Sequence, residues 1–365
     1  MFIRGALILL LYLVSAAGHC FDAPDIYTIS EYFKKYPQQK AVSEQFSNIV
    51  SDDGKPIRFR QQKPVRIAVV YPAIQNSSYW HDSVKAMGER LNELGIRYEL
   101  LKYYSKPSGD YRLQALQLTK AASNDVDYLA VSADSNSIRR LMDGILAKGK
   151  PKVIIQNLTT PLKKWDNYQP FMYVGFDHLQ GARMLSEHYS YIYPKGGKYV
   201  MLYGSKGAVS SQRGGGFEKY SLAKGLIPAA KFYTDFDPDK TYKAAASALS
   251  RFDDLSFFYA CSTDIALGAL KAVEDAGRTG QVLVSGWGGT AAELDLIKRR
   301  KLDFTVMRMN DDNGIAIAEA IRLDMEGTPE QVPQIFSGKF VMVTNSMSTE
   351  MIDNLRARAL RYSDK

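Results

Sequence analysis

Short apolar runs alternate with amphipathic segments along most of this chain, and this alternation limits its fold more than any other feature. The run Arg66-Ile67-Ala68-Val69-Val70-Tyr71 is nearly continuous and β-branched, which is typical of a strand buried on both faces. The next segment places Val84, Met87 and Leu91 on one helical face and ends at Gly95. Repeated strand–helix units of this kind predict a parallel sheet with right-handed crossovers.

The alternation occurs twice. In the first half we expect strands at residues 66–71, 98–103, 127–132, 152–156 and 171–175, with helices between them that include 110–123 and 137–148. Asp177 then caps a helix to about Tyr191, and the second half begins. Its expected strands cover residues 199–203, 231–234, 256–260, 282–285, 303–307 and 339–344, and its helices include 239–251, 313–326 and 349–361. The fold class is therefore α/β, with two doubly wound parallel-sheet lobes joined by a hinge.

The length of 365 residues is too great for one ordinary compact domain and suits two lobes. We expect a signal peptide at 1–19 and an N-terminal extension at 20–64, with a helical stretch from Ile29 to Val50. Lobe 1 is expected to combine 65–176 with about 309–337, and lobe 2 to combine 177–308 with about 338–365. Ligands bind beyond the carboxyl ends of strands in such sheets, so the expected site is the cleft between the lobes, which close by hinge motion.

The first residues have the pattern of a secretory signal. Arg4 supplies a positive charge, Leu7 to Val14 is apolar, and Ser15-Ala16-Ala17 offers small residues for cleavage. The apolar run is shorter than the ~20 residues that span a bilayer, although an uncleaved anchor remains an alternative. We therefore expect an exported protein of the periplasm.

The net charge of +8 raises nucleic acid as a partner. The basic residues are nevertheless spread along the chain, and no helix-turn-helix, zinc-finger or RNP-like pattern is present. The simple interpretation of this charge is a solvated surface. The functional interpretation is an anionic ligand or an acidic partner surface.

Two cysteines are present, Cys20 at the edge of the signal segment and Cys261 after an apolar run. A chain of this size has a core without disulfides, so we interpret Cys261 as a small buried hydrophobic residue. Pairing of Cys261 with Cys20 is the weaker alternative.

Polar, aromatic and cationic residues follow the expected strands at the ends where a cleft would lie. They are hydrogen-bonding groups, two tryptophans and two arginines, as expected for a wall around a polyhydroxylated ligand: Gln75, Ser77, Trp80, Asn157, Arg213, Thr263, Trp287 and Arg308, with Ser132, Asp134 and Asp264 as secondary positions. Each has a simpler interpretation. Asp134 and Asp264 are also suited to cap the following helices, Asn157 to organise its turn, and both tryptophans to pack in a core.

Catalytic machinery is not evident. The four histidines have no metal-ligand spacing, and the chain has no GxSxG elbow, Walker A loop or GxGxxG motif. The glycines of Gly204-Ser205-Lys206-Gly207 and Gly214-Gly215-Gly216 are better explained by close backbone approach near the second-lobe rim. We expect a protein that is not an enzyme and that holds neither metal nor cofactor.

Several motifs resemble the type I periplasmic sugar-binding proteins, and among them the LuxP-type receptors of autoinducer-2. The resemblance runs from about Asp25 to Lys365 and is densest in Val70-Tyr71-Pro72, Ser78-Tyr79-Trp80, Gln156-Asn157-Leu158-Thr159-Thr160-Pro161, Tyr173-Val174-Gly175-Phe176-Asp177-His178, Tyr259-Ala260-Cys261-Ser262-Thr263-Asp264, Gly286-Trp287-Gly288-Gly289 and Thr305-Val306-Met307-Arg308-Met309-Asn310-Asp311-Asp312. These motifs are long and belong to both halves of the chain.

The resemblance implies a ligand and a partner. Receptors of this type bind autoinducer-2 as a furanosyl borate diester, whose boron carries a negative charge, so Arg213 and Arg308 would contact the borate oxygens. Ser132 departs from the threonine of that pattern but keeps its hydroxyl. Boron would enter with the ligand and not as a cofactor. The implied partner is the periplasmic domain of the inner-membrane sensor kinase LuxQ, in quorum sensing.

Three other functions remain to be weighed. One is a binding protein of an ABC importer for a sugar or for boron-free autoinducer-2. Another is an enzyme whose catalytic residues follow no known motif. A LacI-type repressor would share the fold, but the signal segment and the missing DNA-binding headpiece argue against it.

Overall fold

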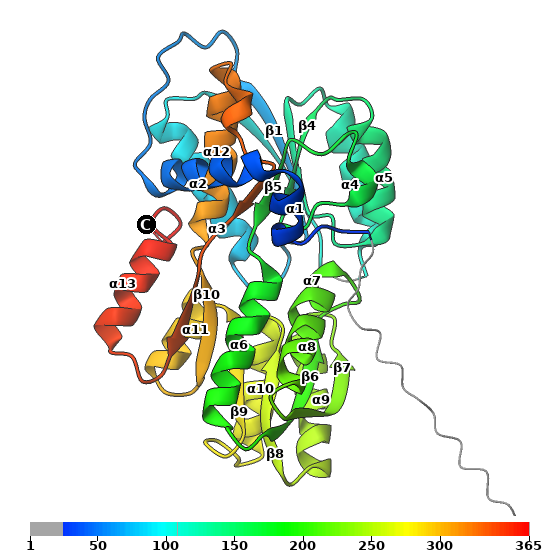
Figure 1. The fold of residues 1–365 in the computed structure, drawn as a ribbon, viewed down its shortest axis with the longest axis vertical. Coiled ribbons are helices and arrows are strands. Elements are labelled where there is room, and N and C mark those ends of the chain that lie inside the picture. Colours follow the sequence, from blue (N-terminus) through cyan, green and yellow to red (C-terminus); the bar gives the residue numbers. More distant parts are fainter. Residues whose placement is uncertain (1–24, 108, 365) are drawn as a thin grey trace, which may run out of the picture.

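Two six-stranded sheets, each covered by helices, form two lobes arranged one above the other (Figure 1). This computed structural model describes residues 25–107 and 109–364. Both sheets are mainly parallel and follow the doubly wound order, so the predicted fold class is confirmed. The expected signal segment and Cys20 lie outside the described residues.

Lobe 1 is built around β1, whose side chains alternate between two apolar layers. Ile67 and Val69 pack with helices α3 and α12 on one face, whereas Ala68 and Val70 pack with α4 and α5 on the other. The sheet order is β11-β5-β4-β3-β1-β2. The bounds are β1 (Val65–Tyr71), α3 (Tyr79–Glu93), β2 (Tyr98–Tyr104), α4 (Tyr111–Ser123), β3 (Tyr128–Val131), α5 (Asn136–Leu146), β4 (Lys152–Gln156), β5 (Met172–Gly175), α12 (Asp311–Met325) and β11 (Ile335–Ser337).

Lobe 2 has the order β12-β10-β9-β8-β6-β7, with β12 antiparallel to β10. Its core contains stacked aromatic rings: Tyr189 and Tyr199 each stack on Phe257, with centroids 3.7 and 5.1 Å from that ring. The bounds are α6 (His178–Ile192), β6 (Gly197–Tyr203), α7 (Ala208–Ser210), a π-helical turn (Ser211–Gly215), α8 (Gly216–Leu222), β7 (Leu226–Tyr233), α9 (Pro238–Arg251), β8 (Leu255–Ala260), α10 (Thr263–Asp275), β9 (Leu283–Gly288), α11 (Ala291–Lys298), β10 (Phe304–Arg308), β12 (Phe340–Thr344) and α13 (Thr349–Ala359).

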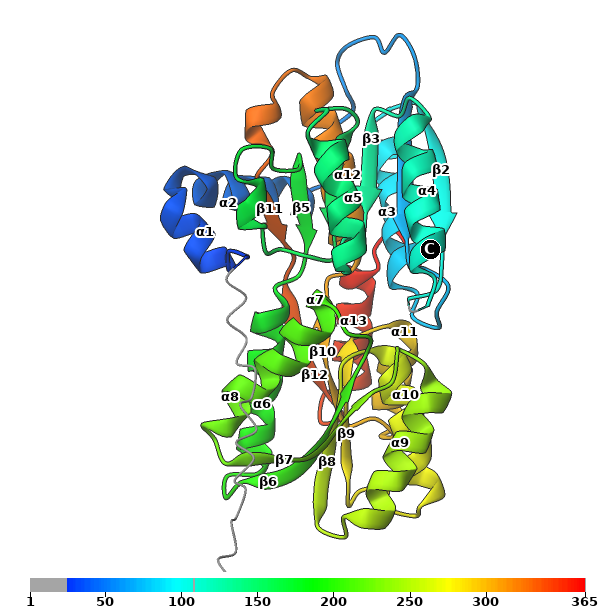
Figure 2. The same cartoon turned by 90° about the vertical axis from the view of Figure 1, so that its right-hand side faces the viewer.

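The chain crosses between the lobes three times, after β5, after β10 and between β11 and β12 (Figures 1 and 2). Helix α13 packs beside lobe 2. The C-terminal tail that follows α13 forms a fourth link, because it returns to lobe 1. The backbone amides of Tyr362 and Ser363 donate to the Asp311 carboxylate at 2.7 and 2.9 Å. The guanidinium of Arg361 donates to the carbonyl oxygens of Val50 and Ser51. The tail therefore ties the end of lobe 2 to lobe 1.

The N-terminal extension differs from the single helical stretch expected for residues 29–50. It forms α1 (Ile29–Lys35) and α2 (Pro37–Ser51), separated at Tyr36, whose φ and ψ are −127° and 73°. Proline disfavours helical backbone at the residue before it, and its missing N–H suits the first position of a new helix. Pro37 therefore starts a second helix where the apolar pattern alone suggests continuity.

Two strands also differ from expectation. The strand expected at 231–234 begins earlier, at Leu226, and β11 was not expected because three residues carry too little pattern. Cys261 is buried and free, as its apolar neighbours predict.

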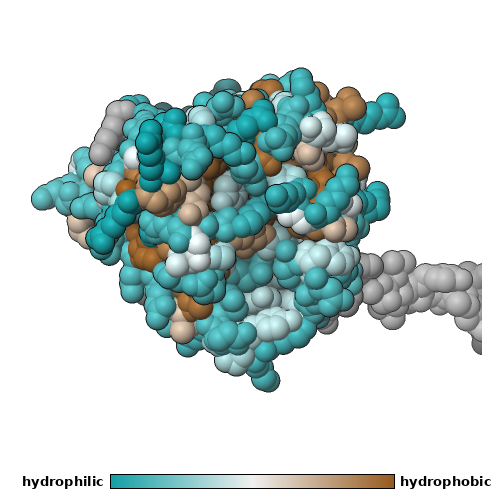
Figure 3. Space-filling view, turned by 90° about the horizontal axis from the view of Figure 1, so that it is seen from above, coloured by the Kyte–Doolittle hydropathy of each residue, from teal (hydrophilic) through white to brown (hydrophobic). Residues whose placement is uncertain are grey.

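The glycine-rich segments of lobe 2 do allow close approach. A Cβ at Gly214 would lie 2.1 Å from the Tyr203 ring, and one at Gly204 would lie 2.1 Å from the Phe236 ring. Seen from the end of lobe 1, hydrophilic residues cover most of the surface, and apolar residues lie in small separate groups (Figure 3). The apolar side chains of this lobe are thus gathered mainly in the two layers beside the sheet.

Helices α3 and α12 touch through Gly314, and this contact predicts a stability effect. A Cβ there would lie 2.1 Å from the Ser83 carbonyl oxygen and 2.6 Å from the Met87 nitrogen. Gly314→Ala should lower the free energy of unfolding by about 1–3 kcal/mol, because the backbones must separate. Gly144→Ala is the control, since a Cβ on that exposed α5 residue meets nothing within 4 Å; it should be neutral or stabilising by up to about 1 kcal/mol. Urea unfolding measures both, and equal effects would contradict the packing argument.

Candidate ligand-binding site

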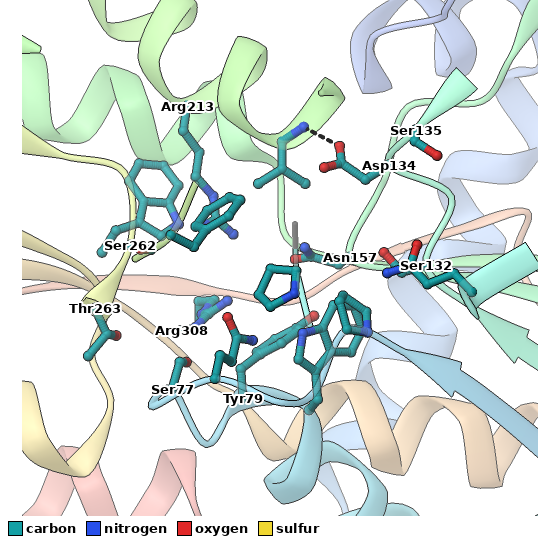
Figure 4. A pocket seen from close by; sticks show the side chains of 18 of the residues that line it. Ser77, Tyr79, Ser132, Asp134, Ser135, Asn157, Arg213, Ser262, Thr263 and Arg308 are labelled. Atoms are coloured by element: carbon teal, nitrogen blue, oxygen red, sulfur yellow. Dashed lines mark hydrogen bonds between the residues drawn. The ribbon is translucent and has the colours of Figure 1, made fainter. Parts of the chain in front are cut away.

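A cavity of about 70 Å³ lies between the lobes, beyond the carboxyl ends of their strands (Figure 4). It has room for roughly five water-sized groups, which suits a single small ring better than an oligosaccharide. Its wall consists of polar, aromatic and cationic side chains from both lobes: Pro72, Gln75, Ser77, Tyr79, Trp80, Pro107, Tyr111, Gln114, Ser132, Asp134, Ser135, Asn157, Val209, Arg213, Phe236, Ser262, Thr263, Trp287 and Arg308.

The eight main residues predicted from the sequence all line this one cavity, as do Ser132 and Asp134. They are brought together from strand ends that lie far apart in the chain. Asp264 is the exception: it is buried but is not part of the lining. The structure thus places the predicted set, while the contacts of these residues with a ligand stay predictions.

Arg213 reaches the cavity from the π-helical turn of lobe 2, and three contacts fix its guanidinium. Its Nη1 donates to the carbonyl oxygen of Cys261 at 2.9 Å, and its Nε donates to Nδ1 of His178 at 3.4 Å. The guanidinium carbon lies 4.9 Å from the centre of the Trp287 ring. The side chain is only 4% exposed, so its direction is set by these contacts and not by solvent.

Arg308 is the last residue of β10 and is held by aromatic faces. Its guanidinium carbon lies 4.1 Å from the centre of the Tyr79 ring and 5.9 Å from that of Phe176. Gly288, at φ +122°, makes room beside it, because a Cβ there would lie 2.4 Å from Nη2 of Arg308. The hydroxyl of Tyr79 accepts from the Asn313 side chain at 2.8 Å, which fixes the ring beneath the cation.

The two arginines give the cavity a positive charge that the surrounding protein does not neutralise by ion pairing. Neither guanidinium forms a salt bridge with any residue that the structure describes. Burial and the neighbouring Arg308 cation lower the pKa of Arg213 to about 9, and burial lowers the pKa of Arg308. A guanidinium keeps its proton in proteins, so both side chains are cationic at neutral pH, but burial places their charges unfavourably.

Three buried polar atoms of lining residues also have no hydrogen-bond partner among the described residues. They are Nε of Arg308, Nε1 of Trp287 and Oδ1 of Asn157, two donors and one acceptor. A buried polar group without a partner costs about 1–3 kcal/mol, so several such groups around one cavity indicate where ligand atoms bind.

The aromatic walls are rigid. Trp80 stacks on Tyr71 with centroids 4.6 Å apart, and the Tyr71 hydroxyl donates to Gln156 at 2.5 Å. Trp287 lies against the start of α6, where a Cβ at Gly181 would meet its ring at 2.6 Å. Both tryptophans are buried and line the cavity, so the core-packing and ligand-platform interpretations both apply to them.

Asn157 takes its position from strained backbone. Its φ of 71° lies in the left-handed region, which asparagine tolerates better than most residues. The backbone N–H of Asn157 donates to the carbonyl oxygen of Val174 at 2.8 Å. Gly175 allows this approach, because a Cβ at that position would lie 3.1 Å from Cα of Asn157. Asn157 therefore both organises its turn and lines the cavity.

Sequence reasoning missed several lining residues, above all Tyr79, Tyr111, Gln114 and Phe236. Tyr79 stands between Ser77 and Trp80, so its place in a strand-end motif was a usable signal. Tyr111 is the first residue of helix α4, and Gln114 lies in its first turn, so a loop separates both from the end of the preceding strand. Phe236 lies in a turn, where its φ is 58°. No spacing pattern in the sequence indicates these three.

Metal ligands do not gather anywhere in residues 25–107 and 109–364, where no three His, Cys, Asp or Glu side chains form a cluster. Across the same described part of the chain, no helix has the length and apolar character needed to cross a bilayer.

A scan against protein families finds a match to the periplasmic binding protein domain over residues 67–329. This match covers most of both lobes. The chain belongs to the periplasmic binding protein family.

Curated relatives and a solved structure agree with this assignment. The D-allose-binding periplasmic protein of Escherichia coli is 25% identical over 78% of this chain and 91% of its own length. The D-ribose/D-allose-binding protein of Pseudomonas aeruginosa is 27% identical over 74% of this chain and 85% of its own length. The fold matches an ABC transporter solute-binding protein of Actinobacillus succinogenes with bound D-allose, with a TM-score of 0.67 and 20% identity, over 80% of this chain and all of that one.

Two aspartates form hydrogen bonds across the cleft between the lobes. Asp264 of lobe 2 accepts from the backbone amides of Asn76 and Ser77 in lobe 1, at 2.9 and 3.3 Å. Asp134 of lobe 1 accepts from the amide of Val209 in lobe 2 at 2.8 Å (Figure 4). The two bonds to Asp264 and the one to Asp134 run in opposite directions across the cleft.

These contacts correct the helix-capping interpretation of both aspartates. The residue that caps α5 is Ser135, and the residue that caps α10 is Ser262, each through its hydroxyl. Asp134 lies one residue before the capping Ser135, Asp264 lies two residues after the capping Ser262, and both use their oxygens between lobes. The sequence could not separate these cases, because capping depends on one residue of register.

The Asp264 contact predicts a conformational effect. Asp264→Ala removes both acceptors, so the ligand-free lobes should separate, with a larger radius of gyration in small-angle X-ray scattering and ligand affinity lower by roughly 5- to 30-fold. Asp237→Ala is a matched control, because Asp237 accepts two amides, of Asp239 and Lys240, inside lobe 2. It should lower stability by about 1 kcal/mol and leave the radius unchanged. An unchanged radius in Asp264→Ala would contradict the inter-lobe role.

Proposed function

We propose that this chain is an exported periplasmic receptor whose cleft binds a small ring-shaped polyol that carries a negative charge. Autoinducer-2, as its furanosyl borate diester, is the ligand of this class that we put forward. The observation that carries the proposal is the pair of buried guanidiniums, Arg213 and Arg308, which form no salt bridge with the described residues.

The energy balance favours an anion. Burying a cation without a counter-ion costs several kcal/mol even after relaxation. The contacts of Arg308 with aromatic faces supply about 2 kcal/mol or more when desolvated, and the charged hydrogen bond from Arg213 to a backbone carbonyl adds a similar amount. These contributions do not offset two buried charges. An anionic ligand with paired oxygens would, since guanidinium groups donate in a planar fork.

The remaining wall supports a polyol ring. Gln75, Ser77, Thr263 and Asn157 supply neutral hydrogen-bonding groups, and Trp80 and Trp287 supply flat apolar faces. Among the described lining residues Asp134 is the one carboxylate, and its oxygen already accepts from Val209. The negative charge of the ligand would therefore face the two arginines and not a wall of acids.

Signalling is part of the same proposal. A ligand that contacts both lobes favours their closed arrangement, and a membrane partner that recognises closure can report occupancy. The resemblance to LuxP-type receptors suggests the periplasmic domain of a LuxQ-type sensor kinase as that partner. Export rests on the signal pattern of residues 1–19 and on relatives that are periplasmic proteins.

A second candidate is the binding protein of an ABC importer for a neutral sugar or boron-free autoinducer-2. The relatives favour this candidate over the signalling one, because their names state ribose and allose as ligands. The polyol wall fits either ligand, and only the arginine pair favours the anion.

Borate dependence separates the two candidates. We expect wild-type protein to bind autoinducer-2 in the presence of boric acid much more tightly than in boron-free buffer, as measured by isothermal titration calorimetry. D-Ribose and D-allose are titrated in parallel. Affinity that is unchanged by removing borate, or tighter binding of either sugar, would replace the proposal with the importer function.

Arginine replacement gives a second prediction. Arg213→Met and Arg308→Met should each weaken binding of the borate form by about 30-fold or more, because truncating a buried charge pair costs 2–5 kcal/mol. Thermal unfolding should show that both variants fold, with equal or higher stability, since an unfavourable buried charge is removed. Arg299→Met, on the exposed end of α11, is the control for loss of one positive charge. Near wild-type affinity in both cavity variants would refute the anion clamp.

A further inference from the structure

His178 lies between two cavity residues that come from different lobes. It is the first residue of α6, directly after the chain crosses from lobe 1 into lobe 2, and it is fully buried. Its Nε2 lies 2.9 Å from the carbonyl oxygen of Asn157, and its Nδ1 lies 3.4 Å from Nε of Arg213. Asn157 belongs to lobe 1 and Arg213 to lobe 2, and both line the cavity (Figure 4).

The partners fix the state of the imidazole. A carbonyl oxygen only accepts, so Nε2 of His178 must carry the proton and donate to Asn157. A guanidinium N–H only donates, so Nδ1 must be unprotonated and accept from Arg213. Only the neutral imidazole with the proton on Nε2 makes both bonds.

The surroundings favour the same state. The charged groups that act on His178 are Arg213 from the π-helical turn and Arg308 from β10, and both cations and burial hold its pKa well below the usual range. The neighbouring Asp177 carboxylate is used by the amides of Leu179 and Gln180. On the remaining side stands the uncharged Trp287 ring, with centroids 6.1 Å apart.

The three contacts of Arg213 use different parts of its guanidinium. The Cys261 carbonyl accepts from Nη1, the Trp287 ring lies beside the guanidinium, and Nδ1 of His178 accepts from Nε. These contacts leave Nη2 as the donor that no described residue engages.

We propose that His178 is a positioning residue for ligand binding, which aligns the Arg213 guanidinium of lobe 2 with Asn157 of lobe 1 through its two ring nitrogens. It does not contact the ligand. The inference rests on the proposed function only in taking Arg213 as the group that faces the ligand. His178 begins α6, where the chain enters lobe 2 from lobe 1. On this proposal, a movement of one lobe relative to the other changes the orientation of Arg213 through the two hydrogen bonds of His178.

The test compares two replacements of His178 with a control on the same helix. His178→Phe keeps an aromatic ring but removes both nitrogens, and should weaken binding of autoinducer-2 with boric acid by about 10- to 100-fold. His178→Gln keeps one donor and one acceptor, and should recover a large part of that loss. His188→Phe and His188→Gln are the controls, since His188 on α6 packs edge-to-face on Phe304, 4.4 Å between centroids, and does not line the cavity. These controls should bind as wild type.

A spectroscopic measurement tests the geometry without any ligand. Long-range ¹H–¹⁵N spectra of wild-type protein at neutral pH should show His178 as the neutral form protonated on Nε2, assigned by its absence in His178→Gln. The chain has only four histidines, which makes this assignment simple. A charged ring, or a proton on Nδ1, would overturn the inference.

The outcomes separate this inference from the proposed function. If wild-type protein binds D-ribose or D-allose and shows no borate dependence, the anion proposal fails, and the same variants are titrated with the sugar that binds. Equal loss in His178→Phe and His178→Gln with unchanged thermal stability would mean that ring shape matters and the hydrogen bonds do not. Wild-type affinity in His178→Phe would likewise overturn the positioning role. If none of these ligands binds, the NMR measurement of the His178 protonation state still tests the proposed hydrogen bonds.

Discussion

Two guanidinium groups are buried where the lobes meet, and the local structure is arranged around the free energy that this costs. Arg308 is accommodated by Tyr79, by Phe176 and by the space that Gly288 leaves. Arg213 is accommodated by a carbonyl oxygen, an indole face and a neutral imidazole. None of these partners carries a negative charge. The donors of the cavity wall are therefore already oriented, and neither guanidinium has a salt-bridge partner among the described residues.

The same region joins the two lobes. Asp264 and Asp134 accept backbone amides across the cleft in opposite directions, and Gln212 donates to Thr160 at 2.9 Å nearby. On the far side of the hinge, the C-terminal tail binds Asp311 at the start of α12. That carboxyl is fully buried, and its burial raises its pKa to about 6. Closure of the cleft thus depends on direct hydrogen bonds between lobes, and the residues of the ligand wall lie among them.

The fold could be predicted from the sequence to a large extent because both lobes are built from buried parallel strands. Such strands appear in the sequence as apolar runs, as in 66–71 and 256–260, and capping residues such as Asp177 mark where the helices between them begin. The prediction failed where the pattern was short or interrupted, at β11 and at the break before Pro37. Ten of the eleven predicted site residues line the cavity because carboxyl ends of parallel strands meet at one edge. Asp264 does not, since its carboxylate turns to the other lobe.

The sequence by itself therefore determined the two α/β lobes, the edge at which the predicted site residues lie and the residue types that gather there. These follow from periodicity and from the direction of parallel strands, which are local properties of the chain. Only the tertiary structure decided which of those side chains are cavity walls and which are bonds between lobes. It alone showed that Arg213 and Arg308 lack acidic partners among the described residues and that His178 joins Asn157 to Arg213. Burial, hydrogen-bond partners and the lack of a salt-bridge partner depend on segments far apart in the sequence. They therefore cannot be predicted from the pattern of any single segment.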